Sequence, residues 1–309
     1  TQFGTPVVTN TNGQDNLRPF SRMNGLGNDF IIFDVMDNDA SLPDDISQNI
    51  WRNIADRDNP ATKGCDQILI LRAAHEQGDC FMDIRNADGS RAESCGNGTR
   101  AVAAYIAKHK GQNNPVIETL GGSLSCAVMS ENRVEVTMPA PKFAWTDIPV
   151  AEEIKTNGVK LHDELPPAFL VNVGNPHAVF FASKKTKWMA SKYGSDLEMH
   201  PLFPQQANIN FAQILRDFER ATILLHTWER GAGLTKACGT GACATAIAAI
   251  ELGATRLPDG TLRTEVDIIP PVNQDRNESD IITIRYQPGA ETYIMRGPAE
   301  FEFDGKVSL

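Results

Sequence analysis

The sequence feature that most constrains the fold is a short motif that occurs once in each half of the chain. Residues 92–107 read A-E-S-C-G-N-G-T-R-A-V-A-A-Y-I-A, and residues 235–250 read T-K-A-C-G-T-G-A-C-A-T-A-I-A-A-I. Aligned on Cys95 and Cys238, both contain C-G-x-G followed by an alanine-rich apolar pattern that predicts a helix. A motif that recurs about half a chain later indicates a duplication, so we predict two similar domains that face each other.

Strand patterns surround both predicted helices. Short apolar runs predict buried strands, and alternating runs predict half-buried ones. These segments are residues 30–34, 67–71, 80–85, 133–138 and 221–228, with a turn at 86–90. We therefore predict an α/β or α+β fold in which each half is mostly strands around one central helix.

Composition divides the chain into a leader and two domains. Residues 1–21 are rich in Thr, Asn, Gly and Gln, and we interpret them as a flexible leader outside the fold. Residues 22–140 form the predicted first domain and 141–294 the second, with Pro139-Ala140-Pro141 as the linker. The polar, turn-rich stretch 256–280 is expected to be an extended surface hairpin.

Overall composition favours a globular protein of the cytoplasm. Hydrophobic residues make up 41% and charged residues 22% of the chain, and no apolar run is long enough to span a membrane. A net charge of −10 argues against a nucleic-acid partner. The leader has no apolar signal-peptide core, which favours six reduced thiols over disulfides. We interpret Cys65, Cys80, Cys126 and Cys243 as small core residues.

Cys95 and Cys238 are the strongest candidates for chemistry. Each precedes a predicted helix, where free backbone amides stabilise an anion such as a thiolate or a carboxylate. At such places the pKa of a thiol can fall from about 8.5 to about 3.5–7.5, in the range useful for acid–base catalysis. Two such thiols could flank one carbon and invert it without a metal or cofactor. A single C-G-x-G would more simply be a packed helix start, but two in matched contexts favour catalysis.

Other polar loop residues are weaker candidates. Asn28 follows a G-x-G pair that lacks the full nucleotide-binding pattern, so we predict contact with a polar group of a substrate. His177 ends a G-N-P-H loop, and Arg230 lies just before the second motif, where it could pair with a carboxylate. The sequence contains no H-E-x-x-H, P-loop or G-x-S-x-G, and no two histidines have metal-ligand spacing, so no metal site is predicted.

Several motifs in order resemble one known family from about residue 22 to the end. The matching stretches are Met23 to Phe30, Gly64 to Gln67, Arg85 to Ser90, Cys95 to Arg100, Gly174 to His177, Asn208 to Phe211, Glu229 to Gly233 and Ala237 to Gly241. The chain thereby resembles the diaminopimelate epimerases, which act without pyridoxal phosphate in bacterial lysine and cell-wall precursor synthesis. Departures are Leu234, where many members carry Glu, and the stretch 256–280, which is longer than usual.

The resemblance implies an α+β fold of two pseudo-symmetric domains, each a curved, mostly antiparallel sheet wrapped around a central helix. It implies interconversion of LL- and meso-diaminopimelate in the cleft between the domains, in a homodimer without cofactors, and residues 295–309 are expected to return to the first domain. Cys95 and Cys238 would be the catalytic pair. The implied substrate contacts are Asn28, Gln67, Asn86, Asn175, Asn208, Glu229 and Arg230, the backbone amides of Gly96, Asn97, Gly239 and Thr240, and the neighbouring polar residue His177.

Three alternatives remain at this point. The first is a sister enzyme on the same fold, although phenazine-type isomerases lack the cysteine pair and proline-racemase-like proteins carry different residues beside it. The second is a binding protein without turnover, which the presence of both cysteines disfavours. The third is a redox or metal-storage protein, which a metal assay would detect.

Overall fold

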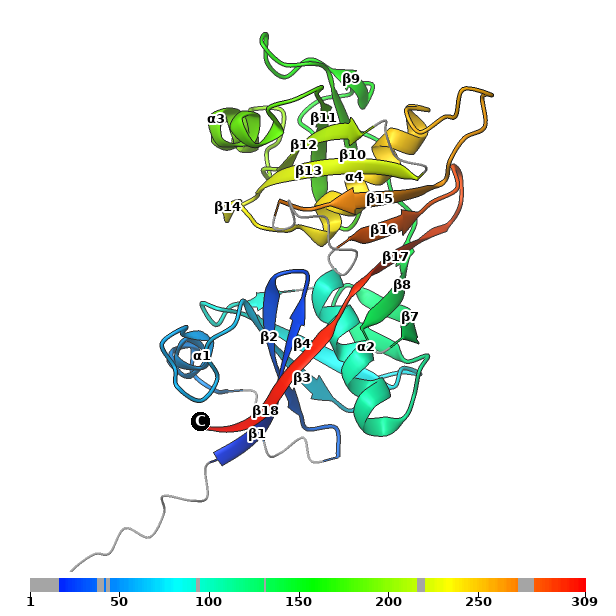
Figure 1. Cartoon of the computed structure of the whole chain (residues 1–309). Coiled ribbons are helices and arrows are strands. Elements are labelled where there is room, and N and C mark those ends of the chain that lie inside the picture. Colours follow the sequence, from blue (N-terminus) through cyan, green and yellow to red (C-terminus); the bar gives the residue numbers. More distant parts are fainter. Residues whose placement is uncertain are drawn as a thin grey trace, which may run out of the picture.

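The computed structural model describes residues 17–37, 42, 45–92, 95–130, 132–215, 220–271 and 281–309. It contains two lobes, one above the other, which meet where β8 and β17 run side by side (Figure 1). The helices are α1 (Gln48–Ala55), α2 (Gly96–Lys110), α3 (Thr186–Glu198) and α4 (Gly239–Glu251). The strands of the first half are β1 (Leu17–Gly25), β2 (Asn28–Asp34), β3 (Gln67–Arg72), β4 (Cys80–Asn86), β5 (Arg91–Ala92), β6 (Val116–Thr119), β7 (Gly122–Ser130) and β8 (Arg133–Pro139). Those that follow are β9 (Asn157–Val159), β10 (Ala168–Asn172), β11 (Pro176–Phe181), β12 (Asn208–Leu215), β13 (Ala221–Glu229), β14 (Gly233–Leu234), β15 (Glu265–Ile269), β16 (Ile282–Arg285), β17 (Thr292–Pro298) and β18 (Glu300–Ser308).

The two halves repeat one order of strand pairing. In the first half β1 and β2 are antiparallel, β2 and β3 parallel, β3 and β4 antiparallel, and β4 and β6 parallel. In the second half β10 and β11 are antiparallel, β11 and β12 parallel, β12 and β13 antiparallel, and β13 and β15 parallel. In both, a helix lies between the second and third strands, and a second helix precedes the last. The duplication predicted from C-G-x-G is thus present in the topology.

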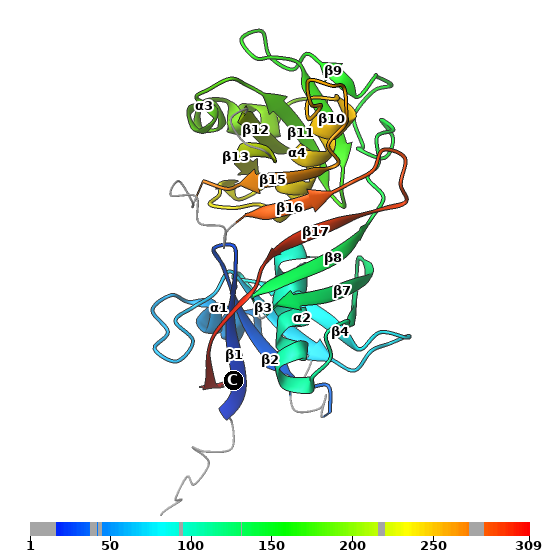
Figure 2. The same cartoon turned by 45° about the vertical axis from the view of Figure 1, so that its right-hand side comes forward.

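The central helices α2 and α4 are buried over most of their surface. Every residue of α4 from Gly241 to Ile250 is buried, as expected for a helix that is apolar on all sides. Strands cover both helices (Figure 2), which confirms the predicted α+β arrangement of a sheet around a central helix in each half. The helix α2 ends at Gly111, whose φ of 72° is the left-handed conformation that glycine adopts without strain.

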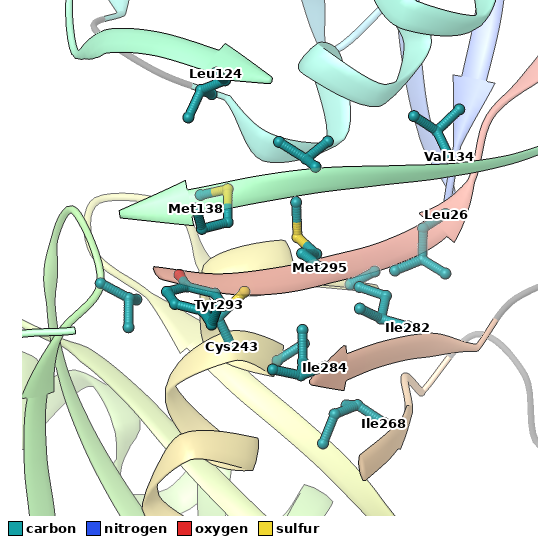
Figure 3. Close-up of a cluster of buried hydrophobic side chains, with 14 of the residues drawn as sticks. Leu26, Leu124, Val134, Met138, Cys243, Ile268, Ile282, Ile284, Tyr293 and Met295 are labelled. Atoms are coloured by element: carbon teal, nitrogen blue, oxygen red, sulfur yellow. The ribbon is translucent and has the colours of Figure 1, made fainter. Parts of the chain in front are cut away.

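One hydrophobic cluster runs through both halves. It joins residues of α2 and α4 with those of β8, β15, β16 and β17. Figure 3 shows Met295 and Tyr293 of β17 between Met138 of β8 and Ile284 of β16, with Cys243 of α4 pointing toward Tyr293. Because the cluster is continuous, the strands at the junction fix the two helices relative to each other.

Each half carries an outer helix that the sequence analysis did not predict. The helix α1 packs Trp51 and Ile54 into a separate cluster with Phe33 and Ile70 on the outer face of the first-half strands. The helix α3 covers the corresponding face of the second half, with Leu197 in its cluster. The expectation of one helix per half was therefore wrong. The outer helices bury only one face, so they lack the continuous apolar pattern from which the central helices were predicted.

Two predicted boundaries need correction. The strand β1 begins at Leu17 and pairs with β18 from Leu17 opposite Ser308, so residues 17–21 belong to the sheet and not to the leader. Residues 1–16 lie outside the described residues. The stretch 256–280 contains β15, which is largely buried between β13 and β16, so that part is no surface hairpin. Its residues 272–280 also lie outside the described part.

The return of the C-terminus is visible in the pairing of β18 with β1 along nearly their whole length. The exact domain limits stay a prediction. Within the described residues, no helix is long and apolar enough to cross a membrane.

Candidate active site

The two cysteines occupy equivalent positions at the starts of α2 and α4. Cys95 and Cys238 are the N-caps of these helices, both in extended backbone conformation. The Sγ of Cys95 accepts a hydrogen bond from Gly98 N at 3.2 Å, and that of Cys238 accepts one from Gly241 N at 3.2 Å. Each thiol therefore caps its own helix, as a side-chain oxygen would in a conventional cap.

The two helix starts touch. A Cβ added to Gly239 would lie 2.7 Å from Oδ1 of Asn97, and one added to Gly96 would lie 2.8 Å from Cε of Met295. A side chain at position 239 would therefore displace the Asn97 amide, and one at position 96 would push aside the flexible end of Met295. The first N–H groups of a helix have no partner inside it, so the amides of the two starts converge on one region.

Burial raises the pKa of both thiols, against the expectation that the helix starts would lower it. Loss of solvation raises the pKa of Cys95 to about 11, although Gly98 N–H and the charge of Arg100 act in the opposite direction. Burial and the nearby Glu229 carboxylate raise that of Cys238 well above its usual value. Both groups are therefore neutral thiols in this conformation, because the capping amides compensate only part of the desolvation.

Glu229 acts on both cysteines. Its charge raises the pKa of Cys95 as well as that of Cys238, which places one carboxyl group near both sulfurs. Burial raises the pKa of Glu229 itself. The three groups are therefore electrostatically coupled across the two halves.

A buried polar chain supports the Cys238 side. His177 Nε2 lies 2.7 Å from Asn175 Oδ1, and Asn175 Nδ2 lies 3.4 Å from Thr240 Oγ1. Thr240 Oγ1 is 3.5 Å from Cys238 Sγ. Burial lowers the pKa of His177 to about 3, so its ring is neutral and donates from one nitrogen only.

Sequence reasoning missed the next member of this chain, Asn210. Its Nδ2 lies 3.0 Å from His177 Nδ1, and its Oδ1 accepts from Thr227 Oγ1 at 2.9 Å. The nitrogen of Asn210 therefore donates to Nδ1, which leaves the proton of His177 on Nε2, facing Asn175. The signal was present, because Asn208 and Asn210 are two residues apart on β12 and so share one face.

Asn208 and Arg230 lie together at the adjoining strand ends. Asn208 Oδ1 accepts from Arg230 N at 2.9 Å, and its Nδ2 donates to Pro176 O at 3.2 Å. The Arg230 side chain is exposed and donates from Nη1 to Gln205 O at 3.0 Å. In this conformation Arg230 is therefore open to solvent.

The first half presents a matching set. Gln67 Nε2 donates to Asn86 Oδ1 at 3.0 Å, and Asn86 Nδ2 donates to Ser90 Oγ at 3.1 Å. Asn97 Nδ2 donates to Asn28 Oδ1 at 2.6 Å. All the predicted residues of this half lie at strand ends or at the start of α2.

Strand register relates the predicted contacts of one half to those of the other. In the first half, Phe30 pairs with Gln67, and Gln67 pairs with Asn86. In the second half, His177 pairs with Asn208, and the next residue, Ile209, pairs with Trp228. Counting along these strands matches three pairs of residues: Asn28 with Asn175, Gln67 with Asn208, and Asn86 with Glu229. The predicted site is therefore duplicated in the same way as the cysteines.

Comparison with known proteins decides the family. The family model of diaminopimelate epimerase matches residues 20–144 and 169–268. The chain belongs to the diaminopimelate epimerase family. A diaminopimelate epimerase of Rhodopseudomonas palustris is 36% identical over 299 residues, covering 94% of this chain and 93% of the relative. One of Sphingopyxis alaskensis is 39% identical over 289 residues, covering 93% and 96%.

Solved structures show that this family shares its fold with other proteins. A phenazine biosynthesis protein of the PhzF family from Bacillus anthracis has a TM-score of 0.65 at 13% identity, covering 95% of this chain and 99% of that one. A hydroxyproline epimerase from Agrobacterium vitis, solved with bound trans-4-hydroxy-L-proline, has a TM-score of 0.64 at 13% identity, covering 96% and 94%. At this identity the likeness concerns the fold alone.

No group of three or more His, Cys, Asp and Glu side chains in the described part of the chain is arranged to hold a metal ion.

Proposed function

We propose that the chain is a diaminopimelate epimerase that interconverts LL- and meso-diaminopimelate in lysine and peptidoglycan precursor synthesis. The observation that carries the proposal is the duplicated site: each half supplies one thiol at a helix start, and the two starts are in contact. Family membership supplies the substrate class.

The proposed reaction is a balanced exchange of protons at the α-carbon. One sulfur, as a thiolate, removes the α-proton, while the other, as a thiol, gives its proton to the opposite face. The first sulfur ends as a thiol and the second as a thiolate, so the pair exchanges states in each inversion. Since burial raises the pKa of both thiols in this conformation, one of them must first lose its proton to solvent before it can remove the α-proton of the substrate.

The helix starts would hold the reacting end of the substrate. The backbone amides of Gly96, Asn97, Gly239 and Thr240 suit an α-carboxylate, because they combine N–H donors with the positive ends of two helix dipoles. The other end of the substrate would contact Asn86, Asn208 and Arg230, which lie at strand ends on both sides of the junction. Arg230 can pair with the distal carboxylate through two parallel hydrogen bonds.

We further propose that the protein works as a homodimer in the cytoplasm without metal or pyridoxal phosphate. The cysteine pair offers a complete proton path, so dialysis against a chelator is expected to leave the rate unchanged. Activity that returned only on addition of a metal would contradict this part of the proposal.

The deciding experiment is incubation with LL-diaminopimelate in D2O, followed by chiral separation and mass analysis. We expect meso-diaminopimelate carrying one deuterium, while unreacted LL substrate stays unlabelled at early times because a different group returns the proton. Binding without product would indicate a non-catalytic protein. Efficient racemisation of lysine instead would indicate a sister racemase.

A further inference from the structure

Arg100 is a fully buried cation next to the site. It lies on α2 just beyond Cys95 and has a relative exposure of 0%. The titratable groups that act on it among the described residues are the thiols of Cys95 and Cys243 and the guanidinium of Arg133. No carboxylate of the described residues forms an ion pair with it, and a buried charge without such a partner is costly. Such a group is a candidate functional residue.

The fold provides a fitted slot for this guanidinium. A Cβ added to Gly297 of β17 would lie 2.8 Å from Arg100 Nε and 2.9 Å from Cζ, so only a glycine lets the group lie against the strand. Nε donates to Pro298 O at 3.2 Å, and Nη1 lies 3.5 Å from Met295 Sδ. The group is thus held at a defined place between α2 and three residues of β17, namely Met295, Gly297 and Pro298.

The remaining nitrogen determines how two amide side chains are oriented. Arg100 Nη2 donates to Asn97 Oδ1 at 2.8 Å. A guanidinium only donates, so it fixes the oxygen of Asn97 on its side and turns the amide nitrogen toward Asn28 Oδ1, 2.6 Å away. Asn28 is then left with its Nδ2 group, which is a donor, for a ligand. The oxygen of Asn97 also lies so close to Gly239 that a larger residue at position 239 would displace it.

We propose that Arg100 is a positioning residue that holds Asn97 and thereby makes Asn28 present an N–H donor to an oxygen atom of the substrate. This inference rests on the proposed function. The same cation acts on the nearby sulfur: its charge lowers the pKa of Cys95, whereas burial and the charge of Glu229 raise it, and Gly98 and Asn97 N–H lower it. Arg100 therefore has two separable effects, one geometric and one electrostatic.

Two substitutions separate these effects. Arg100→Met removes both the charge and the donors. Arg100→Lys keeps the charge, but a single ammonium cannot replace the two guanidinium nitrogens that donate to Pro298 O and Asn97 Oδ1. The matched control is Arg296→Met, which removes a cation from the same strand as the slot, where Arg296 pairs with Glu135 at 2.6 Å. The measurements are KM and kcat for LL-diaminopimelate, and the pH dependence of Cys95 alkylation by iodoacetamide, read by mass spectrometry.

We expect KM to rise about tenfold or more in both Arg100 variants, the effect of losing one hydrogen bond to a charged group. The alkylation profile should move to higher pH in Arg100→Met and stay near that of the wild type in Arg100→Lys. Arg296→Met should leave both quantities unchanged. Unchanged KM in both Arg100 variants, or an equal change in the control, would overturn the proposal.

A third variant covers the case in which the Arg100 variants do not fold. Gly297→Ala displaces the guanidinium from Asn97 but keeps its charge, so KM should rise while the alkylation profile stays in place. Failure of all three variants to fold, with a folded Arg296→Met, would make Arg100 a structural residue and would also overturn the proposal. If the wild type does not turn over diaminopimelate, the proposed function fails, while the alkylation profiles still report whether Arg100 acts on Cys95.

Discussion

At the scale of single residues, the structure changes how the two thiols are understood. A helix start is expected to lower a thiol pKa, but both sulfurs are buried, and burial raises the thiol pKa. Desolvation then prevails, and the pKa of Cys95 is about 11. In the proposed mechanism, one thiol must therefore lose its proton to solvent against this desolvation before it can act as a base.

Replacing either cysteine with serine should abolish most epimerisation. Cys95→Ser and Cys238→Ser keep the size and the cap of the helix, but a hydroxyl is a far weaker acid than a thiol. We expect the turnover number to fall at least about 100-fold, the low end for loss of a general acid or base. Circular dichroism should show an intact fold. Near-normal turnover by either variant would refute the two-thiol mechanism.

Arg230 should decide between diaminopimelate and lysine, because lysine lacks the distal carboxylate. The Arg230 side chain is exposed in this conformation, so its pairing should contribute about 1.5–3 kcal/mol, as for a hydrogen bond to a charged group, and less than a buried ion pair would. Arg230→Met should therefore reduce kcat/KM for diaminopimelate about 10- to 100-fold, measured by chiral separation of the products. Lysine should not be turned over by the wild type. A variant that used both substrates as the wild type does would show that Arg230 is a surface residue.

At the scale of elements, the sequence predicted those that carry their own signal. The strands β2, β3, β4, β8 and β13 and the central helices α2 and α4 lie where apolar runs or the repeated motif placed them. The strand β15 was missed because its short Val-Asp-Ile-Ile core stands among polar residues, and only pairing with the distant β13 makes it a buried strand. A local pattern cannot report a partner that lies 45 positions away in the sequence, as Ala221 does from Val266.

The residues of the candidate site also divide into those with a local sequence signal and those that depend on distant partners. The sequence and the family resemblance identified the residues at strand ends and helix starts. They did not identify Asn210 and Arg100, whose roles depend on partners from other elements: His177 for the first, and Pro298 with Gly297 for the second. Nothing in the chain near Arg100 indicates that it is buried, because the slot is made by β17 near the C-terminus.

Gly241 in the first turn of α4 offers a test of how tightly that element is fitted. A Cβ there would lie 2.7 Å from Asn210 Oδ1 and 2.8 Å from Thr227 Oγ1, which are hydrogen-bonded to each other and buried. Gly241→Ala should therefore cost about 1–3 kcal/mol of unfolding free energy through overpacking and should also reduce kcat, since the Cys238 side shifts. Urea denaturation and initial rates measure the two effects.

The matched control for that element is Gly111 at the end of α2. Its φ of 72° is unfavourable for alanine, but no other atom lies within 4 Å of an added Cβ. Gly111→Ala should lose about 1–2 kcal/mol of stability through backbone strain and keep full activity. Equal activity in the two variants would contradict a tightly fitted α4 start.

At the scale of the whole molecule, the two thiols proposed as catalytic belong to a larger set of buried ones. Burial raises the pKa of Cys95 to about 11 and that of four further thiols to about 12, those of Cys65, Cys80, Cys126 and Cys243. In the unfolded chain these groups ionise near pH 8.5. Their contribution to stability is therefore complete below about pH 8.5 and is lost as pH rises toward the folded values.

The chain should thus unfold progressively in alkali, and removing one buried thiol should weaken that dependence. Each such thiol contributes about 1.4 kcal/mol per pH unit to the fall in unfolding free energy above about pH 8.5. We expect Cys80→Ala to lose about 2 kcal/mol less than the wild type between pH 7 and pH 10, measured by urea denaturation at both values. Val136→Ala, in the same hydrophobic cluster, removes apolar contacts but no titrating group. It should be less stable than the wild type by the same free energy at both pH values. Suppose that the unfolding free energies of the cysteine and valine variants change equally with pH. Cys80 would then ionise as readily in the folded protein as in the unfolded chain, a result that would contradict the effect expected from its complete burial.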